Sequence, residues 1–131
     1  MNAPAHPPLG ELRFADITQE MSPDRRSAFL ADLARLLPPD CLLTSLEARR
    51  PYECDGLSGY RHVPAAVALP RNEAEAAAVL RCCHDHEVPV VARGAGTGLS
   101  GGATPHRGGL VLSLAKLSQI LSIDPMARTA R

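Results

Sequence analysis

Residues 64–92 hold the pattern that most constrains the fold: a short apolar strand, an amphipathic helix and a second apolar strand. The first strand is expected around residues 66–69 and the second at 88–92. Asn72 is a helix N-cap candidate, and Glu75 three residues later completes a capping box with Asn in place of Ser or Thr. A strand–helix–strand unit of this length predicts two parallel strands joined by a right-handed crossover.

The expected helix carries one apolar face, which recurs at Ala76, Val79, Leu80 and Cys83. Its last turn reads CCHDH, where Cys82 and His86 are spaced i, i+4 and could share a metal ion. No second cluster of ligands stands elsewhere in the sequence to complete the coordination, so no metal site is predicted. Instead Cys83 is expected to pack into the core and Cys82 to lie at the edge of the core. His84 and His86 are expected to face water.

Length and composition limit the classes of protein to which the chain can belong. The chain has 131 residues, enough for one domain, with 14 basic and 14 acidic residues, so nothing indicates a nucleic-acid surface. The four cysteines show no C-x-x-C spacing and are expected to be reduced thiols. Residues 1–20 fit neither a signal peptide nor a transmembrane segment, so we expect a loose leader and, by default, a cytoplasmic location.

An amphipathic helix is expected within residues 21–40. Ser22 is the N-cap candidate, Pro23 suits the first helical position, and a Pro-Pro pair follows. The apolar face comprises Phe29, Leu30, Leu33, Leu36 and Leu37. This helix is interpreted as a packing element.

Between residues 40 and 62 a short strand or turn is expected, followed by an ordered loop. Two tyrosines and two acids in that loop are either substrate or cofactor contacts or a cover for the edge of the core. They are Tyr52, Glu53, Asp55 and Tyr60. Beyond residue 103 the pattern predicts strands at 109–114 and 120–124, joined by a turn or short helical connection, and the approach to another strand at the end.

Seven of the ten glycines fall within residues 94–109, directly after the second expected strand. Glycine allows positive φ and close approach of a ligand to the main chain, so clustered N–H groups can form an anion-binding nest. Thr97 and Ser100 add hydroxyl donors, and Arg93 is expected to place a fixed positive charge at the mouth of the loop. This chemistry suits a pyrophosphate.

Two common phosphate-binding patterns fail. A Walker A loop needs a lysine next to its last glycine, and the one lysine, Lys116, lies well beyond the loop. Residues 96–101 match G-x-G-x-x-G, but the Rossmann fold needs a helix there, and Pro105 with the Gly108-Gly109 pair leaves no room for one.

The whole segment resembles a third pattern. RGAGTGLSGG after a strand–helix–strand unit, with YECDGLSGYRHVPAAVALPRNEAE upstream, resembles the flavin-binding domain of the vanillyl-alcohol oxidase and p-cresol methylhydroxylase (PCMH) type. Within that family it is similar to the FAD-linked subunits of glycolate oxidase and to D-lactate dehydrogenases. The resemblance implies an α+β fold: an N-terminal helix, a small parallel βαβ subdomain with a glycine-rich pyrophosphate loop, and the first strands of an incomplete antiparallel subdomain. Residues 41–131 would form the N-terminal part of this FAD-binding domain.

Carried over position by position, the resemblance implies that one continuous loop wraps the FAD pyrophosphate. Its residues are Arg93, Gly94, Ala95, Gly96, Thr97, Gly98, Leu99, Ser100 and Gly101. Some relatives attach the flavin through a histidine in or next to this loop. No histidine lies between Arg93 and Thr104, and His106 falls outside the matching positions, so non-covalent FAD is expected.

The family chemistry implied is oxidation of a 2-hydroxy acid such as glycolate or D-lactate by hydride transfer to the flavin. Electrons would pass to an iron–sulfur partner, with a second flavin-type subunit in the complex and peripheral association with the inner membrane through these partners. No residue here matches the base that such chemistry needs, so no catalytic residue is predicted and the chain alone is expected to be inactive. The alternative is a free-standing, non-catalytic flavin- or nucleotide-binding module completed by another chain.

Overall fold

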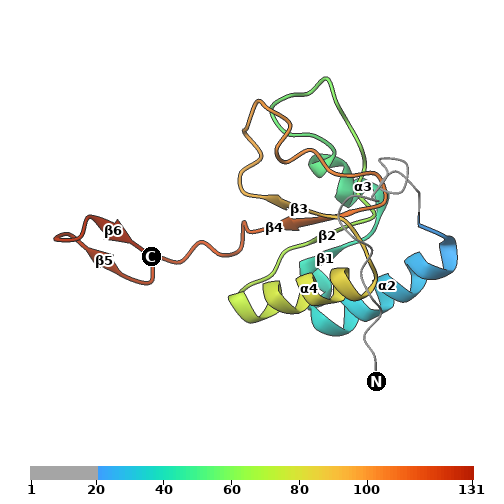
Figure 1. Cartoon of the computed structure of the whole chain (residues 1–131), viewed down its shortest axis with the longest axis horizontal. Helices are drawn as coiled ribbons and strands as arrows, with labels where there is room; N and C mark the ends of the chain where they lie inside the picture. The colour runs from blue at the N-terminus through green and yellow to red at the C-terminus, as the bar shows by residue number, and fades with distance from the viewer. Residues whose placement is uncertain (1–20) are drawn as a thin grey trace, which may run out of the picture.

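The computed structural model describes residues 21–131; the expected leader at residues 1–20 lies outside the described residues. A four-stranded sheet has the order β1-β2-β4-β3. Helices α2 and α4 pack side by side against one face of this sheet, and loops gather at the far end of the molecule (Figure 1). The mixed α/β architecture with its parallel sheet is the one expected from the sequence.

The elements run in the following order. The first half contains α2 (Pro23–Leu36), the 3-10 turn η1 (Pro39–Cys41), β1 (Leu42–Leu43), α3 (Leu46–Arg49) and the 3-10 turn η2 (Arg50–Tyr52). The second half contains β2 (Ala66–Ala68), α4 (Glu73–Asp85), β3 (Val90–Arg93), β4 (Leu110–Ser113), β5 (Ile123–Asp124) and β6 (Thr129–Ala130). Helix α3 falls where only a loop was expected, because four residues are too few to show a helical period.

Strands β2 and β3 are parallel, as predicted, but they are not neighbours. Strand β4 lies between them and pairs parallel with both, while β1 pairs antiparallel with β2. Burial explains the order: every residue of β4 is buried, whereas β3 is only partly covered and forms an edge. The expected strand at 88–92 is accordingly shifted to Val90–Arg93.

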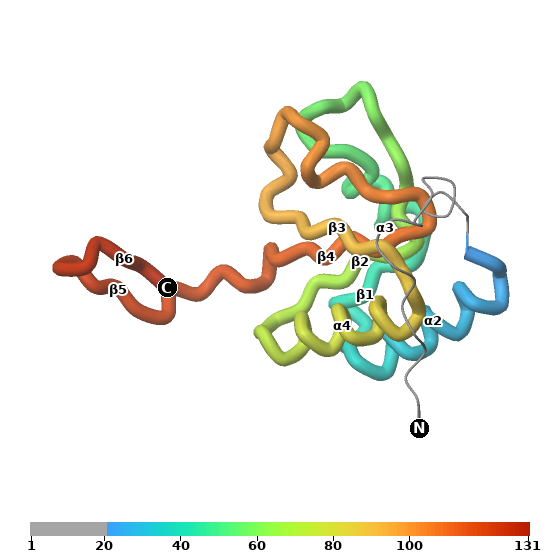
Figure 2. Tube along the Cα trace, viewed as in Figure 1, coloured from blue at the N-terminus to red at the C-terminus, as the bar shows by residue number. Residues whose placement is uncertain are grey.

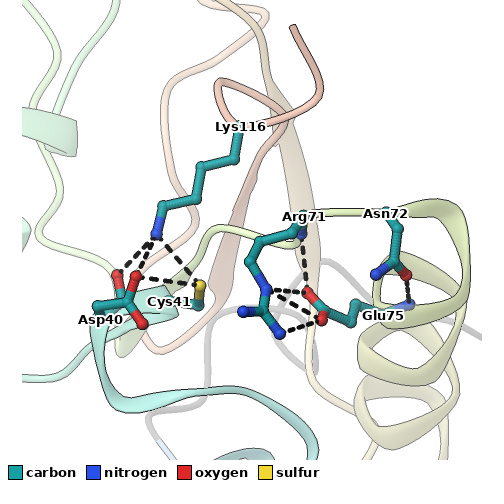
Figure 3. A network of polar contacts seen from close by, with 6 residues as sticks. All are labelled: Asp40, Cys41, Arg71, Asn72, Glu75 and Lys116. Atoms are coloured by element: carbon teal, nitrogen blue, oxygen red, sulfur yellow. Dashed lines mark hydrogen bonds and ion pairs between the residues drawn. The ribbon is translucent and has the colours of Figure 1, made fainter. Parts of the chain in front are cut away.

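The two long helices begin at the predicted caps. Ser22 Oγ accepts from the N–H of Arg25 at 3.4 Å, and Asn72 Oδ1 accepts from the N–H of Glu75 at 2.9 Å. The Glu75 carboxylate accepts from the N–H of Arg71 at 2.8 Å, one residue before the position a capping box uses (Figure 3). The guanidinium of Arg71 lowers the pKa of Glu75 by hydrogen bonding.

The buried faces of α2 and α4 are narrower than the apolar faces predicted from the sequence. Phe29 and Leu33 of α2 and Val79 of α4 are fully buried, but Leu36 and Leu80 are 39% and 46% exposed. Leu36 and Leu80 therefore lie at the solvent-exposed margins of the two apolar faces. Burial raises the pKa of the Cys83 thiol to about 12, so that cysteine stays protonated at neutral pH.

The CCHDH segment also differs from expectation. Cys82 is buried together with Cys83, and His86 does not face water. Its Nε2 lies 2.9 Å from Asp32 Oδ2, and its ring packs edge-on against Phe29 with centroids 5.5 Å apart. His86 therefore joins α4 to α2. Within residues 21–131 no cluster of three or more metal-ligating side chains is present.

Beyond β4 the chain leaves the body of the molecule as an arm that ends in the antiparallel β5–β6 hairpin (Figure 1). Lys116 ties the root of this arm to the body: its Nζ lies 2.6 Å from Asp40 Oδ2 and 3.2 Å from Cys41 Sγ (Figure 3). Hydrogen bonding to Lys116 lowers the pKa of Asp40. Among the described residues no helix has the length and apolar character needed to cross a membrane.

Candidate functional site

The connection from β3 to β4, residues 94–109, consists of turns and bends without a helix, as the sequence predicted. Gly96, Gly101 and Gly108 have φ of 72°, 77° and 80°. Only glycine takes up this left-handed region without strain, so these positions explain part of the glycine cluster.

The backbone of the loop presents unused donors. From Gly94 through Gly102, no backbone N–H donates a hydrogen bond to any group within residues 21–131. The side chains of Thr97 and Ser100 are exposed beside these amides. A run of amides and hydroxyls without acceptors is the donor set that an anion such as a pyrophosphate requires.

Arg93 holds the loop from behind. Its Nη1 donates to the carbonyl oxygen of Cys54 at 2.7 Å, and its guanidinium carbon lies 5.5 Å from the centre of the Tyr52 ring. A Cβ on Gly96 would come within 2.2 Å of Arg93 Nη2, so the loop lies directly on the guanidinium. This charge was expected at the mouth of the loop; it lies instead beneath the loop, where it joins two distant segments.

A second support comes from residues 54–57. The N–H of Gly56 donates to the carbonyl oxygen of Gly98 at 2.8 Å, and a Cβ on Gly56 would lie 2.8 Å from that oxygen. The Asp55 carboxylate is only 5% exposed and accepts from the N–H groups of Leu57 at 2.8 Å and Ala103 at 3.5 Å. The two loops therefore run side by side (Figure 2).

The four residues singled out in the loop at 40–62 make different contacts. Asp55 and Tyr52 support the glycine loop, Glu53 pairs with Arg61 at 2.8 Å, and Tyr60 is 66% exposed. No local pattern indicates that Cys54, Asp55 and Gly56 support the loop, because the contacts join segments about forty residues apart. Gly56 was the one available signal, since a glycine beside a buried acid is compatible with close backbone approach.

Eight of the nine residues predicted for the cofactor, Gly94 to Gly101, lie in this single loop at the carboxyl end of β3, and Arg93 is the last residue of β3 itself. In a sheet with parallel strands, ligands commonly bind outside the carboxyl ends of the strands. Glycines, unused amides and two exposed hydroxyls lie together there, with positive charge behind them. These features are the ones that a dinucleotide diphosphate would need in a site without a helix N-terminus.

This fold and loop define a flavoprotein-type nucleotide-binding domain. The chain belongs to the FAD binding domain family, whose model matches residues 64–131. It is 48% identical over 108 residues to the glycolate oxidase subunit GlcD of Escherichia coli (strain K12), covering 82% of this chain and 21% of that protein. The GlcD subunit of Bacillus subtilis (strain 168) is 41% identical over 98 residues, covering 75% and 21%.

A solved structure of p-cresol methylhydroxylase with substrate bound matches with a TM-score of 0.70 and 24% identity, covering 80% of this chain and 21% of that one. This likeness shows the PCMH-type fold. The chain spans 21% of the length of the two glycolate oxidase subunits.

FAD is the cofactor of this family, and the geometry of the loop is compatible with it. A Cβ on Gly94 or Gly102 would meet nothing within 4 Å, so the main chain is open to a ligand at both ends of the loop. Together with the unused amides, this access fits the diphosphate of FAD.

Proposed function

We propose that residues 93–101 wrap the pyrophosphate of a non-covalently bound FAD. The observation that carries the proposal is the run of backbone N–H groups from Gly94 to Gly102 that have no acceptor within residues 21–131. Amide donors to an anion form charge-assisted hydrogen bonds, which are stronger than those between neutral groups. Thr97 and Ser100 supply hydroxyl donors, and Arg93 and Asp55 hold the loop in shape.

The protein to which this domain belongs is, in this proposal, an FAD-dependent 2-hydroxy-acid oxidoreductase. The support is the relation to glycolate oxidase subunits and the family match. FAD supplies the hydride acceptor for oxidation of the α-carbon of a substrate such as glycolate or D-lactate. Residues 21–131 bind and position the cofactor; we assign no catalytic residue among them, so this chain alone is inactive in our proposal.

Partners follow from the same relation. We infer an iron–sulfur subunit and a second flavin-type subunit that take part in one complex, in the cytoplasm and peripherally attached to the inner membrane. The relatives are named as subunits, which supports an assembly of several chains.

The test of the loop compares two glycine substitutions. A Cβ added to Gly98 would have no neighbour closer than 3.8 Å, and Gly98 lacks a positive φ, so the backbone at this position accepts a side chain. The methyl groups of Gly98→Val are expected to block the approach of a diphosphate, and thermal unfolding checks that the variant is folded. Losing one or two charge-assisted hydrogen bonds weakens FAD binding by about tenfold to a thousandfold, measured by flavin fluorescence titration. Gly59→Val is the matched control, because Gly59 also has open space and lies outside the loop.

Equal FAD affinity in the wild type and Gly98→Val would remove the loop from the cofactor site. Acid precipitation tests the non-covalent attachment. The flavin should leave with the supernatant, and flavin retained on the precipitated chain would contradict this part of the proposal.

A further inference from the structure

A second cluster of positive charge lies away from the glycine loop. A pocket of about 170 Å³ opens where three arginines from distant segments meet: Arg26 of α2, Arg49 of α3 and Arg107 before β4. Its backbone walls include Ala65 and Gly108, which stand just before the first residues of β2 and β4. Parallel strands have their amino ends at one edge, so this pocket lies at the edge opposite the carboxyl end of β3, where the glycine loop begins.

Two of these arginines are positioned by the backbone between them. Arg49 Nη1 donates to the carbonyl oxygens of Pro64 at 2.5 Å and Ala65 at 3.4 Å. Arg26 Nη2 donates to the same Ala65 oxygen at 3.4 Å. Both guanidinium groups are thus fixed on one carbonyl and turned toward the same space.

One donor in the pocket has no acceptor. Arg26 Nε is buried and makes no hydrogen bond within the part of the chain that the structure describes. A buried charged donor without a partner is costly, and such groups normally have an acceptor or a bound ion. An incoming oxygen atom would relieve this cost.

The positive charges of Arg26 and Arg49 repel each other. Burial lowers the pKa of Arg49, and the nearby charge of Arg26 lowers it further, while Glu47 raises it. Neither Arg26 nor Arg49 forms an ion pair with a carboxylate in residues 21–131. An anion between the guanidinium groups removes this repulsion.

We propose that this arginine pocket is an oxyanion site, which binds phosphate or carboxylate between Arg26, Arg49 and Arg107. Guanidinium groups present planar forks of N–H donors that match the oxygens of both anions. The oxygen source is a small anion from solution. The site is independent of the proposed flavin loop.

The experiment titrates inorganic phosphate against the 131-residue chain at constant ionic strength, balanced with chloride, and records the midpoint of thermal unfolding. Saturating phosphate is expected to raise the midpoint by about 4 °C or more, because a ligand that binds only the folded state stabilises it. Arg26→Gln and Arg107→Gln should each abolish at least half of the rise. Arg81→Gln, an exposed arginine on α4, removes the same charge outside the pocket and should leave the rise intact.

A further variant tests the location of the site. Gly98→Val must keep the phosphate effect; loss of the effect in Gly98→Val but not in Arg26→Gln would move the anion to the glycine loop and overturn the proposal. The absence of a phosphate-specific rise in the wild-type chain would also overturn the oxyanion site.

Discussion

Two connections join the parallel strands of this sheet. Both carry the chain from the end of one strand to the start of a parallel one, but one is a helix and the other is a loop. From β2 to β3 the chain crosses through α4, which satisfies its amides internally and buries Val79 and Cys83 against the sheet. From β3 to β4 it crosses through a loop without a helix, whose amides from Gly94 to Gly102 have no acceptor in residues 21–131.

The difference lies in what holds each connection in place. Apolar burial fixes α4, whereas the glycine loop is tethered by polar contacts of Arg93, Asp55 and Gly56. Beyond its first turn, the amides of α4 are used within the helix. A connection held from behind by side chains keeps its amides available, and this separation of support from binding is the basis of the proposed FAD loop.

The largest effect is expected from a substitution that disrupts the packing of α4 against α2. Phe29 is fully buried and contacts His86 at the end of α4, so Phe29→Ala removes a large side chain from the interface of the two helices. We expect the free energy of unfolding to fall by about 3–5 kcal/mol in urea denaturation. Leu36→Ala on the same helix is the control, since Leu36 is 39% exposed and should cost far less.

If the two connections are supported separately, flavin affinity per folded molecule of Phe29→Ala stays at the wild-type value. A parallel loss of flavin affinity under conditions where the variant is folded would show that the glycine loop also depends on helix packing.

A smaller effect is expected from the tethered connection. Gly96→Ala forces a side chain into φ of 72° and brings its Cβ within 2.2 Å of Arg93 Nη2. The expected cost is about 1–3 kcal/mol of unfolding free energy, together with weaker FAD binding because the loop must leave its support. Gly94→Ala, where the new methyl group meets nothing, is the control for stability. Unchanged stability and affinity in Gly96→Ala would mean that the support by Arg93 is dispensable.

The smallest effect is expected from a substitution of the N-cap of α4. Asn72→Ala removes the acceptor for the N–H of Glu75 and should lower the free energy of unfolding by about 1 kcal/mol. Asn72→Asp keeps an oxygen there and should restore most of that stability. Thermal unfolding measures both variants, and a change in FAD affinity in Asn72→Ala without a change in stability would contradict the separation of the two connections.

The sequence predicted what local periodicity and end signals specify. The caps at Ser22 and Asn72, both long helices and the absence of a helix after β3 are confirmed, because each depends on neighbours a few residues apart. The strand order was beyond such reasoning: no local pattern indicates that β4 inserts between β2 and β3. Side-chain partners across the fold, such as His86 with Asp32, were missed for the same reason.

For the candidate site, the sequence located the loop but not its supports. The spacing of the glycines, together with Pro105 after them, was enough to distinguish this loop from a Rossmann dinucleotide-binding loop. The direction of the Arg93 side chain depends on Cys54 and Tyr52, about forty residues earlier, and only the folded chain brings them together. The expected cofactor contacts of the nine loop residues remain predictions.

The central place of β4 has a consequence for the order of folding. Strands β2 and β3 have no ladder with each other, and each gains its parallel partner only through β4. During synthesis, the complete sheet therefore cannot form before residues 110–113 have emerged. Strand β2 has no parallel partner until α4 and the glycine loop have been synthesised. Such non-local pairing slows folding, so the entropy of closing the glycine loop contributes to the rate at which the entire domain forms.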